Sequence, residues 1–462
     1  MAMHPGWVRT EIGVANAPLG KAQSISGMLE VIERLTTKST RKFFDCDGRE
    51  LPWLCLSQRV DKSVDCGADY YRVDFGDMTP SHTMERNVSM TRKILTAVFF
   101  CFILTSLISC QHVTTTDEPG SGIAHGPQQS DEPEIVIWHG LRQKVGHLGI
   151  AQDDFNLMGR VSPAGSIASL TYRLNGGPFV RLNFGEDTPG FRRFAGLGHF
   201  NADISMRDLR PGTNSVEVIA VDGTWRRAVQ EVIVDLQSGS YQLPVNIDWA
   251  TIDDPQDVGQ YVDGHWELGP DGLRTKHMGY DRIFLIGEKN WQDYEIEVSM
   301  IINQVDEDAS PSDGGNGLGI LFRFTGHING GPRNFPKMQP KWGYQPFGAI
   351  TWLRWEPGKP VDTPYMEFHR GDINRRLNHG QFPVEIGELY WMKAKCQSLP
   401  DRSNGESVSR YSFKIWRHGN MEPAGWSWQE TQISRHAKRK GGVALLAHHV
   451  DVTFGNIRIK SL

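Results

Sequence analysis

Short runs of alternating hydrophobic and polar residues dominate the chain from residue 134 onwards. Leu170, Tyr172 and Leu174 alternate with polar neighbours, and a second alternating run follows the turn at 175–177. Two alternating runs around an Asn-Gly turn are a strong signal for a β-hairpin. Because similar runs recur roughly every 8–12 residues, residues 134–237 are predicted to form a β-sandwich.

The same kind of pattern continues through residues 241–462. Its apolar runs are short, and none has the length and the 3.6-residue period of a normal helix. The predicted strands centre on Ile283–Ile286, Tyr294–Val298, Gly319–Phe322, Ile350–Trp352, Met366–Phe368, Tyr390–Met392, Tyr411–Ile415, Val443–Leu445 and Val452–Ile459. The sequence therefore predicts a second β module and an all-β protein.

One apolar run, Ile94–Ile108, is long but falls short of the roughly 20 residues of a membrane-spanning helix. It follows Met90 and two basic residues and ends in Leu-Ile-Ser-Cys110, which resembles a bacterial lipoprotein signal at 90–109. The resemblance implies a lipid anchor on Cys110, a cell-envelope location and a flexible tether at 110–133. Gln111 after the cysteine favours the outer membrane. The alternative is a buried core helix with an incidental cysteine.

Residues 1–53 have a sequence pattern that differs from the rest of the chain. The stretch Pro5-Gly6 with Thr10, an amphipathic pattern at 25–35 and the ending Leu51-Pro52-Trp53 resemble the C-terminal end of short-chain dehydrogenases. The glycine-rich phosphate loop and the Tyr-x-x-x-Lys pair of that family are absent, so no dinucleotide site is expected. Residues 54–89 match neither part. We expect 1–89 to be non-native or disordered and translation to begin at Met90; a dehydrogenase assignment would rest on 1–53 alone.

Both β modules resemble known folds. The run from Leu209 to Val216, with Pro-Gly and Asn, resembles bacterial immunoglobulin-like modules. Residues 241–462 resemble the concanavalin A-like jelly roll of lectins, glucanases and laminin-G-like domains, through Trp291-x-x-Tyr294-Glu295 and the closing Phe454-Gly-Asn-Ile457. The resemblances imply an immunoglobulin-like sandwich followed by a jelly roll, but that fold hosts many functions.

Composition narrows the function classes. The chain has 462 residues, a net charge of -5 and 22% charged residues, so no nucleic-acid partner is expected. A mean hydropathy of -0.41 excludes a polytopic membrane protein. After Cys110 the sequence holds one further cysteine, Cys396, so the mature protein is expected to have no internal disulfide. Cys396 is predicted to be a small buried residue of a strand.

Aromatic and polar residues of the second module suggest a sugar-binding face. Aromatic rings stack on the apolar faces of sugars, while charged groups orient hydroxyls. The expected ligand-binding residues are Arg323, His327, Trp342, Trp352, Arg354 and His448. Trp352 and Arg354 share a strand face by the period of two, and Arg323 and His327 are expected to join them. The alternative is that the tryptophans are simply core.

Oxygen-bearing residues crowd one loop of the second module, and hard oxygen ligands can hold Ca²⁺. The possible metal ligands are Asp306, Glu307, Asp308, Asp313 and Asn316. An ordinary solvated acidic loop is the alternative, and no other cofactor is expected.

Catalysis has little support in the sequence. Glu295 and Glu297 share a strand face, but the carboxylate that completes the jelly-roll glucanase signature is missing, so no catalytic residue is assigned. We therefore expect an envelope lipoprotein whose jelly roll binds polysaccharide or surface glycan without catalysis. A glycan-cleaving enzyme on the same fold and a purely structural envelope protein are the alternatives.

Overall fold

The structure, a computed structural model, divides into two units, residues 1–121 and 122–462. It describes residues 132–185, 192–309, 315–328, 339–341, 343, 347–373 and 375–462, together with the backbone of three short strands near the N-terminus. The predicted signal at 90–109, Cys110 and nearly all of the predicted tether lie outside the described residues. Within the described part, no helix is long and apolar enough to cross a membrane.

The N-terminal unit is described through one small sheet. Its strands are β1 (Ala2–His4), β2 (Phe43–Asp45) and β3 (Glu50–Leu51). β1 pairs in parallel with β2, and β2 pairs antiparallel with β3. The amphipathic segment at 25–35 and residues 54–89 lie outside the described residues, so the expectations for them remain predictions.

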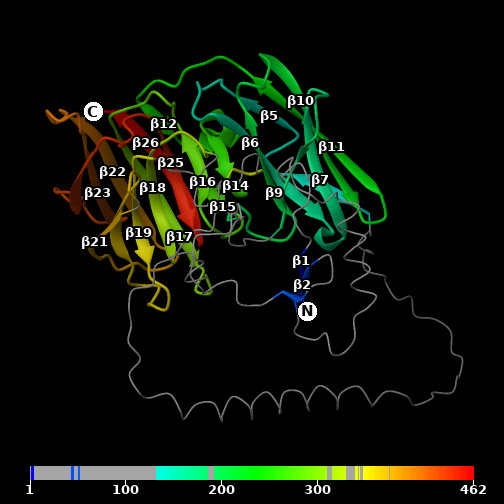
Figure 1. The fold of residues 1–462 in the computed structure, drawn as a ribbon. Coiled ribbons are helices and arrows are strands. Elements are labelled where there is room, and N and C mark those ends of the chain that lie inside the picture. Colours follow the sequence, from blue (N-terminus) through cyan, green and yellow to red (C-terminus); the bar gives the residue numbers. More distant parts are fainter. Residues whose placement is uncertain are drawn as a thin grey trace, which may run out of the picture. The chain divides into compact units, whose positions relative to one another are not determined.

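The first β module is a sandwich of a three-stranded and a five-stranded sheet (Figure 1). The smaller sheet has the order β4-β6-β9, with β4 (Glu134–Ile137), β6 (Asp154–Ser162) and β9 (His199–Ser205). The larger has the order β5-β11-β10-β7-β8, with β5 (Arg142–Val145), β7 (Ile167–Leu174), β8 (Val180–Arg181), β10 (Gly212–Asp222) and β11 (Arg227–Leu236).

The predicted hairpin of this module is confirmed. β7 and β8 pair antiparallel, and the turn between them holds Asn175 and Gly176 at positive φ, 50° and 70°. A turn with two such residues follows the twist of the flanking strands, which is why Asn-Gly signals it so reliably. Alternate residues such as Leu170, Val216 and Val234 point inwards and form the core of the sandwich.

The second module consists of two large sheets packed face to face. The eight-stranded sheet runs β14-β15-β26-β17-β22-β23-β24, and its eighth strand, β12, pairs with the C-terminal part of β26. Its strands are β12 (Val245–Ile247), β14 (Trp266–Gly269), β15 (Gly272–Thr275), β17 (Tyr294–Val305), β22 (Leu389–Leu399), β23 (Ser407–Arg417), β24 (Trp428–Ser434) and β26 (Val450–Ser461).

The seven-stranded sheet runs β13-β16-β25-β18-β19-β20-β21. Its strands are β13 (Gln260–Asp263), β16 (Arg282–Ile286), β18 (Asn316–Phe324), β19 (Ala349–Trp355), β20 (Tyr365–Arg370), β21 (Arg375–Gln381) and β25 (Gly442–His448). Short 3-10 turns at Ala164–Ser166, Trp249–Thr251 and Pro255–Asp257 are the helical elements named among the described residues. The predicted all-β class is confirmed.

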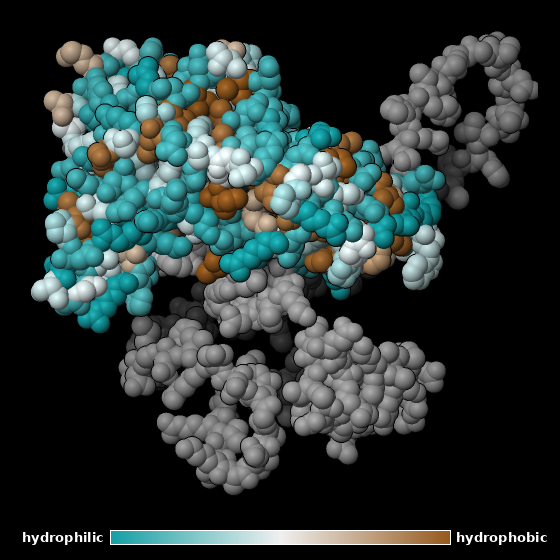
Figure 2. All heavy atoms as spheres, turned by 90° about the horizontal axis from the view of Figure 1, so that it is seen from above, coloured by the Kyte–Doolittle hydropathy of each residue, from teal (hydrophilic) through white to brown (hydrophobic). Residues whose placement is uncertain are grey.

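Each face of the seven-stranded sheet carries its own apolar cluster. Its inner face, with Leu318, Ile320 and Phe322 of β18, packs against the eight-stranded sheet in the main core. Cys396 is fully buried in this core, as predicted. The opposite face, hereafter the outer face, carries a smaller cluster that includes Leu321 of β18 and Ala151 of the first module. Figure 2 shows exposed hydrophobic residues as separate patches on a mainly hydrophilic surface.

Candidate functional site

Strand register places the predicted ligand residues of β19 and β25 in one lattice on the outer face. His448, Gly317 and Arg354 lie side by side across β25, β18 and β19. One step along the strands, Gly319, Trp352 and Glu367 lie side by side across β18, β19 and β20. Trp352, Arg354 and His448, three of the expected ligand-binding residues, thus lie on one face, and all three side chains are buried.

Two glycines of β18 make room for the indole of Trp352. A Cβ at Gly317 would lie 2.5 Å from two ring carbons of Trp352, and one at Gly319 would collide with its Cβ. The side of the central strand that faces outwards is therefore bare, and the indole lies across it. The Arg354 guanidinium stands over the same ring, 4.6 Å from its centroid, in a cation–π contact.

Glu367 lies at the centre of this lattice. Its carboxylate accepts a hydrogen bond of 2.7 Å from the Trp352 indole N–H, and the Tyr365 hydroxyl lies 3.5 Å away. The side chain is 3% exposed. Burial raises the pKa of Glu367 above its ordinary value, and the nearby guanidinium of Arg354 only partly offsets this. Burial also lowers the pKa of Arg354.

A second acid faces His448 on the neighbouring strands. Asp281, just before β16, lies 2.8 Å from Nδ1 of His448. Burial acts to raise the pKa of Asp281, but His448 outweighs it and the pKa stays below its ordinary value. His448 also packs edge-on against Tyr280, with ring centroids 4.5 Å apart, and lies 6.0 Å from Trp352. We call Asp281, Trp352, Arg354, Glu367 and His448 the polar patch.

The rim of the polar patch is accessible. Tyr280, Tyr365 and Arg192 are partly exposed, and Arg376 on the edge strand β21 is exposed. Arg192, from the first module, stacks over Tyr280 at 4.6 Å. Burial raises the pKa of both tyrosines to about 12, so they remain neutral hydroxyl donors over the ordinary pH range. The site thus has a buried polar floor and an exposed aromatic and cationic rim.

Arg323 does not belong to this face, and the prediction that it lines the face with Trp352 is wrong. Residue 323 has a positive φ of 53° at a bulge where the pairing of β18 with β25 shifts register. The bulge turns the fully buried guanidinium towards the other sheet. There it donates to Ser409 Oγ, Ser398 Oγ and the carbonyl of Lys438, at 2.8–3.1 Å. Arg323 is a structural link between the sheets.

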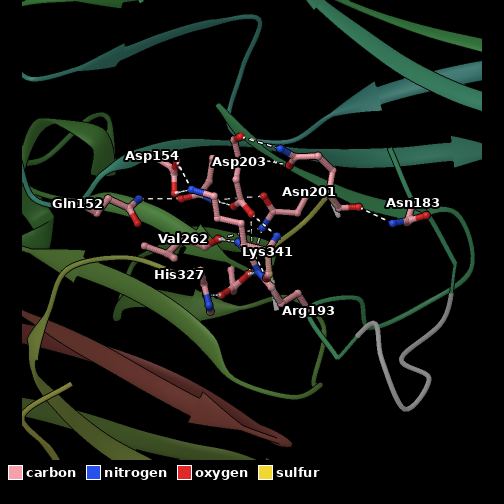
Figure 3. Close-up of polar contacts among 12 residues, drawn as sticks. Gln152, Asp154, Asn183, Arg193, Asn201, Asp203, Val262, His327 and Lys341 are labelled. Carbon is pink, nitrogen blue, oxygen red and sulfur yellow. Dashed lines mark hydrogen bonds and ion pairs between the residues drawn. The ribbon is translucent and has the colours of Figure 1, made fainter. Parts of the chain in front are cut away.

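His327 is also buried away from the polar patch. Its Nε2 lies 2.6 Å from Asp263 Oδ2, within a set of polar contacts that joins the two β modules (Figure 3). We call this set the junction network; its members with ionisable side chains are Asp154, Arg193, Asp203, Asp263, His327 and Lys341. His327 thus helps to hold the modules together, and the prediction that it lines a ligand face with Trp352 is wrong.

Arg193 is the centre of the junction network. Its guanidinium bridges Asp203 of β9 at 2.7 Å and Asp263 of β13 at 2.5 Å. Lys341 closes the other side, because its Nζ donates to Asp154 at 2.6 Å while its backbone N–H donates to Asp203. Burial acts to raise the pKa of Asp263, yet Arg193 and His327 outweigh it and the pKa stays low. The network is therefore charged and tightly paired.

Histidines flank the junction network on the same face of β9. His199 shares this face with Asn201 and Asp203 by the period of two. Its ring meets Trp138 edge-on at 4.8 Å and lies 5.2 Å from His277 of the second module. Burial lowers the pKa of His199 to about 3, and the neighbouring His277 acts in the same direction. His199 is thus neutral at physiological pH.

The predicted calcium ligands do not converge. Asn316 donates to the backbone carbonyl of Asp306, and the carboxylate of Asp306 accepts from the backbone N–H of Asp308 and faces His449 at 3.6 Å. Among the described residues, no group of three or more His, Cys, Asp or Glu side chains is arranged to hold a metal. The described members thus do not fit a Ca²⁺ site by themselves. Asp313 and the predicted ligand residue Trp342 lie outside the described residues.

Sequence reasoning missed Glu367, Asp281 and the two tyrosines. Glu367 is the single acid of its strand, and an acid in a strand ordinarily indicates a solvent-exposed face. Its signal was the alternation Tyr365, Glu367, His369, which places three polar side chains on the face opposite Met366 and Phe368. Asp281 comes before its strand, and only the pairing of β16 with β25 brings it to His448.

Comparisons with known proteins give no family assignment. No family model matches the chain. A stretch of 51 residues is 45% identical to the protein named C-signal from Myxococcus xanthus. It covers 11% of this chain and 31% of that protein, so the chain spans about a third of that relative's length.

Solved structures resemble the chain only distantly. A xylan β-1,4-xylosidase from Bacillus halodurans C-125 is 10% identical at a TM-score of 0.29; the match covers 67% of this chain and 64% of that one. The Ca²⁺-bound exoplasmic/lumenal domain of VIP36 is 10% identical at a TM-score of 0.26, and the match covers 43% of this chain and 82% of that one. The glucan-utilisation protein SGBP-B from Bacteroides ovatus is 9% identical at a TM-score of 0.16, and the match covers 71% of this chain and 100% of that one. TM-scores of this size establish neither a shared fold nor a shared ligand.

Proposed function

We propose that the polar patch and its rim bind carbohydrate. The observation that carries the proposal is a set of buried charged groups at the centre of an outer sheet face, bordered by partly exposed tyrosines. Burying Arg354 and Glu367 beneath a sheet surface costs stability, and charged groups kept at such a cost are often there for a ligand.

The chemistry of the site suits a sugar. The rings of Tyr280 and Tyr365 offer apolar faces to the C–H groups of a pyranose, and their hydroxyls offer donors. Glu367 and Arg354 supply an acceptor and donors in fixed positions behind them. Small-molecule sites typically have a small number of polar groups set among aromatic rings, because the polar groups fix the orientation of the ligand.

A panel of neutral and acidic oligosaccharides tests this proposal. Tyr365→Ala removes a rim ring and should weaken glycan binding at least tenfold, measured by calorimetry on the full chain. Phe179→Ala is the matched control, since Phe179 is an exposed ring of the first module, 61% exposed. Absence of binding to every glycan, or equal losses in both variants, would contradict the proposal.

Glycan cleavage is a second candidate for the same site. The raised pKa of Glu367 suits a carboxylic acid that delivers a proton to a leaving glycosidic oxygen. The Asp281–His448 pair could then accept the proton of an attacking water, whose oxygen bonds to the anomeric carbon. Release of reducing ends from a bound glycan, lost in Glu367→Gln, is the expected result. A bound glycan that stays intact indicates binding alone.

We also propose that the protein is an envelope lipoprotein anchored through Cys110 and translated from Met90, with the outer membrane as the favoured site. The signal-like order of residues 90–110 supports this. Cys110→Ala should move the protein from the membrane fraction to the soluble fraction, because acyl chains supply most of such membrane affinity. A variant that still sediments with membranes after a salt wash, or native peptides from 1–85, would contradict it.

A further inference from the structure

We infer that the first β module binds a lipid bilayer through the tip of the hairpin between β10 and β11, where the indole of Trp225 enters the membrane surface. The inference rests on the proposed lipoprotein function for its orientation, and it adds the surface of the protein that touches the membrane. It starts from one side chain whose exposure and backbone conformation the fold does not require.

Trp225 stands in solvent at the tip of this hairpin. Its side chain is 88% exposed, whereas Trp138 of the same module is 8% exposed. An indole gains free energy when it leaves water, so a ring kept on the tip contributes almost nothing to the burial that stabilises the fold. Its place on the surface therefore suggests a role outside the folding of the module.

The backbone of Trp225 is in a conformation that favours glycine. Its φ is 69°, and a bulky residue rarely adopts a positive φ because its Cβ crowds the backbone. The turn between β7 and β8 meets the same need with Asn175 and Gly176, which tolerate it. A tryptophan kept in such a conformation indicates that its side chain has a function.

Asp222 holds the tip in one shape. Its buried carboxylate accepts hydrogen bonds from the backbone N–H groups of Thr224 and Arg226, at 2.8 and 2.9 Å, and from Nε of Arg226 at 2.7 Å. The backbone N–H of Trp225 donates to the carbonyl of Asp222 at 3.1 Å. The loop thus presents the indole in a fixed position, which reduces the entropy lost on binding.

The tip lies at the end of the sandwich where the chain enters the module. Glu134, the first residue of β4, pairs with Ser162, the last residue of β6. The short turn that follows β6 ends at Ser166, and the carbonyl of Ser166 accepts a hydrogen bond of 3.0 Å from the backbone N–H of Gly223. The start of β4 and the hairpin tip therefore share one end of the sandwich.

This end is also the one to which the proposed tether attaches, because the proposed anchor Cys110 precedes β4 in the sequence. The opposite end lies about 30 Å away, since β10 has 11 residues and each advances by about 3.3 Å. A module anchored in this way meets the bilayer with the Trp225 end more readily than with the other.

The chemistry of the tip suits the interface between lipid and water. The side chains of Thr224, Arg226 and Arg227 beside the ring are exposed. Tryptophan collects at membrane interfaces because its ring has an apolar body and one N–H donor. Guanidinium groups beside it are suited to headgroup phosphates. One ring binds weakly by itself, so it acts together with the acyl anchor and orients the module.

Vesicle binding of the full chain with Cys110→Ala separates the contribution of Trp225 from that of any acyl chain. The probe is vesicles of phosphatidylethanolamine and phosphatidylglycerol, and sedimentation measures the partition coefficient. Trp225→Gly removes the ring and suits the positive φ, so the Tm should stay the same or rise. The partition coefficient should fall about fivefold or more, because the buried ring is lost.

Phe179→Ala is the matched control. Phe179 is also an exposed aromatic residue of the first module, 61% exposed. It lies beside the far end of β7, where the guanidinium of Arg173 stands over its ring at 5.4 Å. Because this position is remote from the hairpin tip, Phe179→Ala should leave vesicle binding unchanged.

Three outcomes would overturn the inference. The first is absence of vesicle binding by the Cys110→Ala chain, and the second is equal losses in Trp225→Gly and Phe179→Ala. The third is a loss of binding to insoluble polysaccharide in Trp225→Gly with unchanged vesicle binding, which would mean that the ring stacks on sugars. Native protein without an acyl chain on Cys110, whose vesicle binding still depends on Trp225, would contradict the lipoprotein proposal and support this inference.

Discussion

The junction network and the polar patch are both buried sets of charged groups, yet they differ in what borders them. In the junction network, Arg193 and Lys341 meet Asp154, Asp203 and Asp263 at direct ion-pair distances. His327 adds a hydrogen-bonding contact to Asp263, with 2.6 Å between Nε2 and Oδ2.

The polar patch also pairs its acids within the protein, but it borders a rim where Tyr280 and Tyr365 are partly exposed and Arg376 is exposed. The comparison teaches that burial alone does not identify a binding site. A network enclosed between two modules fastens them together, whereas one bordered by exposed side chains is suited to a ligand.

The largest effect is expected from breaking the junction network. Arg193→Met leaves Asp203 and Asp263 buried without their shared cation, which should cost about 3–5 kcal/mol of the free energy of unfolding. Urea unfolding followed by tryptophan fluorescence measures the loss. A decrease below about 1 kcal/mol would mean that the network is no tighter than a surface ion pair.

Acidification should weaken the same junction through His199. Its pKa in the folded protein, about 3, lies below the ordinary 6.5, so the unfolded chain takes up the proton first. Stability is therefore full above pH 6.5 and falls as the pH drops towards 3, by up to about 1.4 kcal/mol per pH unit for one group.

Unfolding at pH 7, 6 and 5 tests this, with His199→Gln as the comparison. The neighbouring His265, His277, Arg160 and Arg282 also disfavour the proton on His199. They remain in the variant, so only the contribution of His199 should disappear. An identical pH slope in the variant and the natural protein would show that His199 does not carry the effect.

In contrast to Arg193→Met, removal of a charge from the polar patch should not lower the stability of the protein. Glu367→Gln keeps an oxygen acceptor for the Trp352 indole and removes a carboxylate whose burial is costly. We expect an unchanged or higher Tm, together with glycan binding at least tenfold weaker, which is about 1.4 kcal/mol. A lower Tm with unchanged binding would place Glu367 among structural groups like Arg193.

The smallest effect is expected at an exposed ion pair of the first module. Arg142 lies 2.7 Å from Asp235, but its side chain is 69% exposed. Arg142→Gln should change the free energy of unfolding by less than about 1 kcal/mol, because water already screens such a pair. Urea unfolding under the same conditions as for Arg193→Met measures the contrast. Similar losses in the two variants would remove the distinction between buried and surface pairs.

Local patterns predicted the strands well and the site only in part. The Asn175–Gly176 hairpin and the burial of Cys396 depend on neighbouring residues, and both are confirmed. Arg323 was misplaced because the period of two fails at a bulge, which reverses the direction of a side chain. His327 was misplaced because its partner, Asp263, lies 64 residues away, a contact that no local pattern encodes.

The bare surface of β18 has a consequence for how this protein could change its ligand. A methyl group at Gly317 would lie 2.5 Å from two ring carbons of Trp352, so a larger residue there must displace the indole. Through the Trp352–Glu367 hydrogen bond, that displacement would reach the carboxylate. The depth and outline of the recognition surface are therefore adjustable from one position beneath it, and substitutions at Gly317 should retune selectivity while leaving the tyrosines and arginines of the rim unchanged.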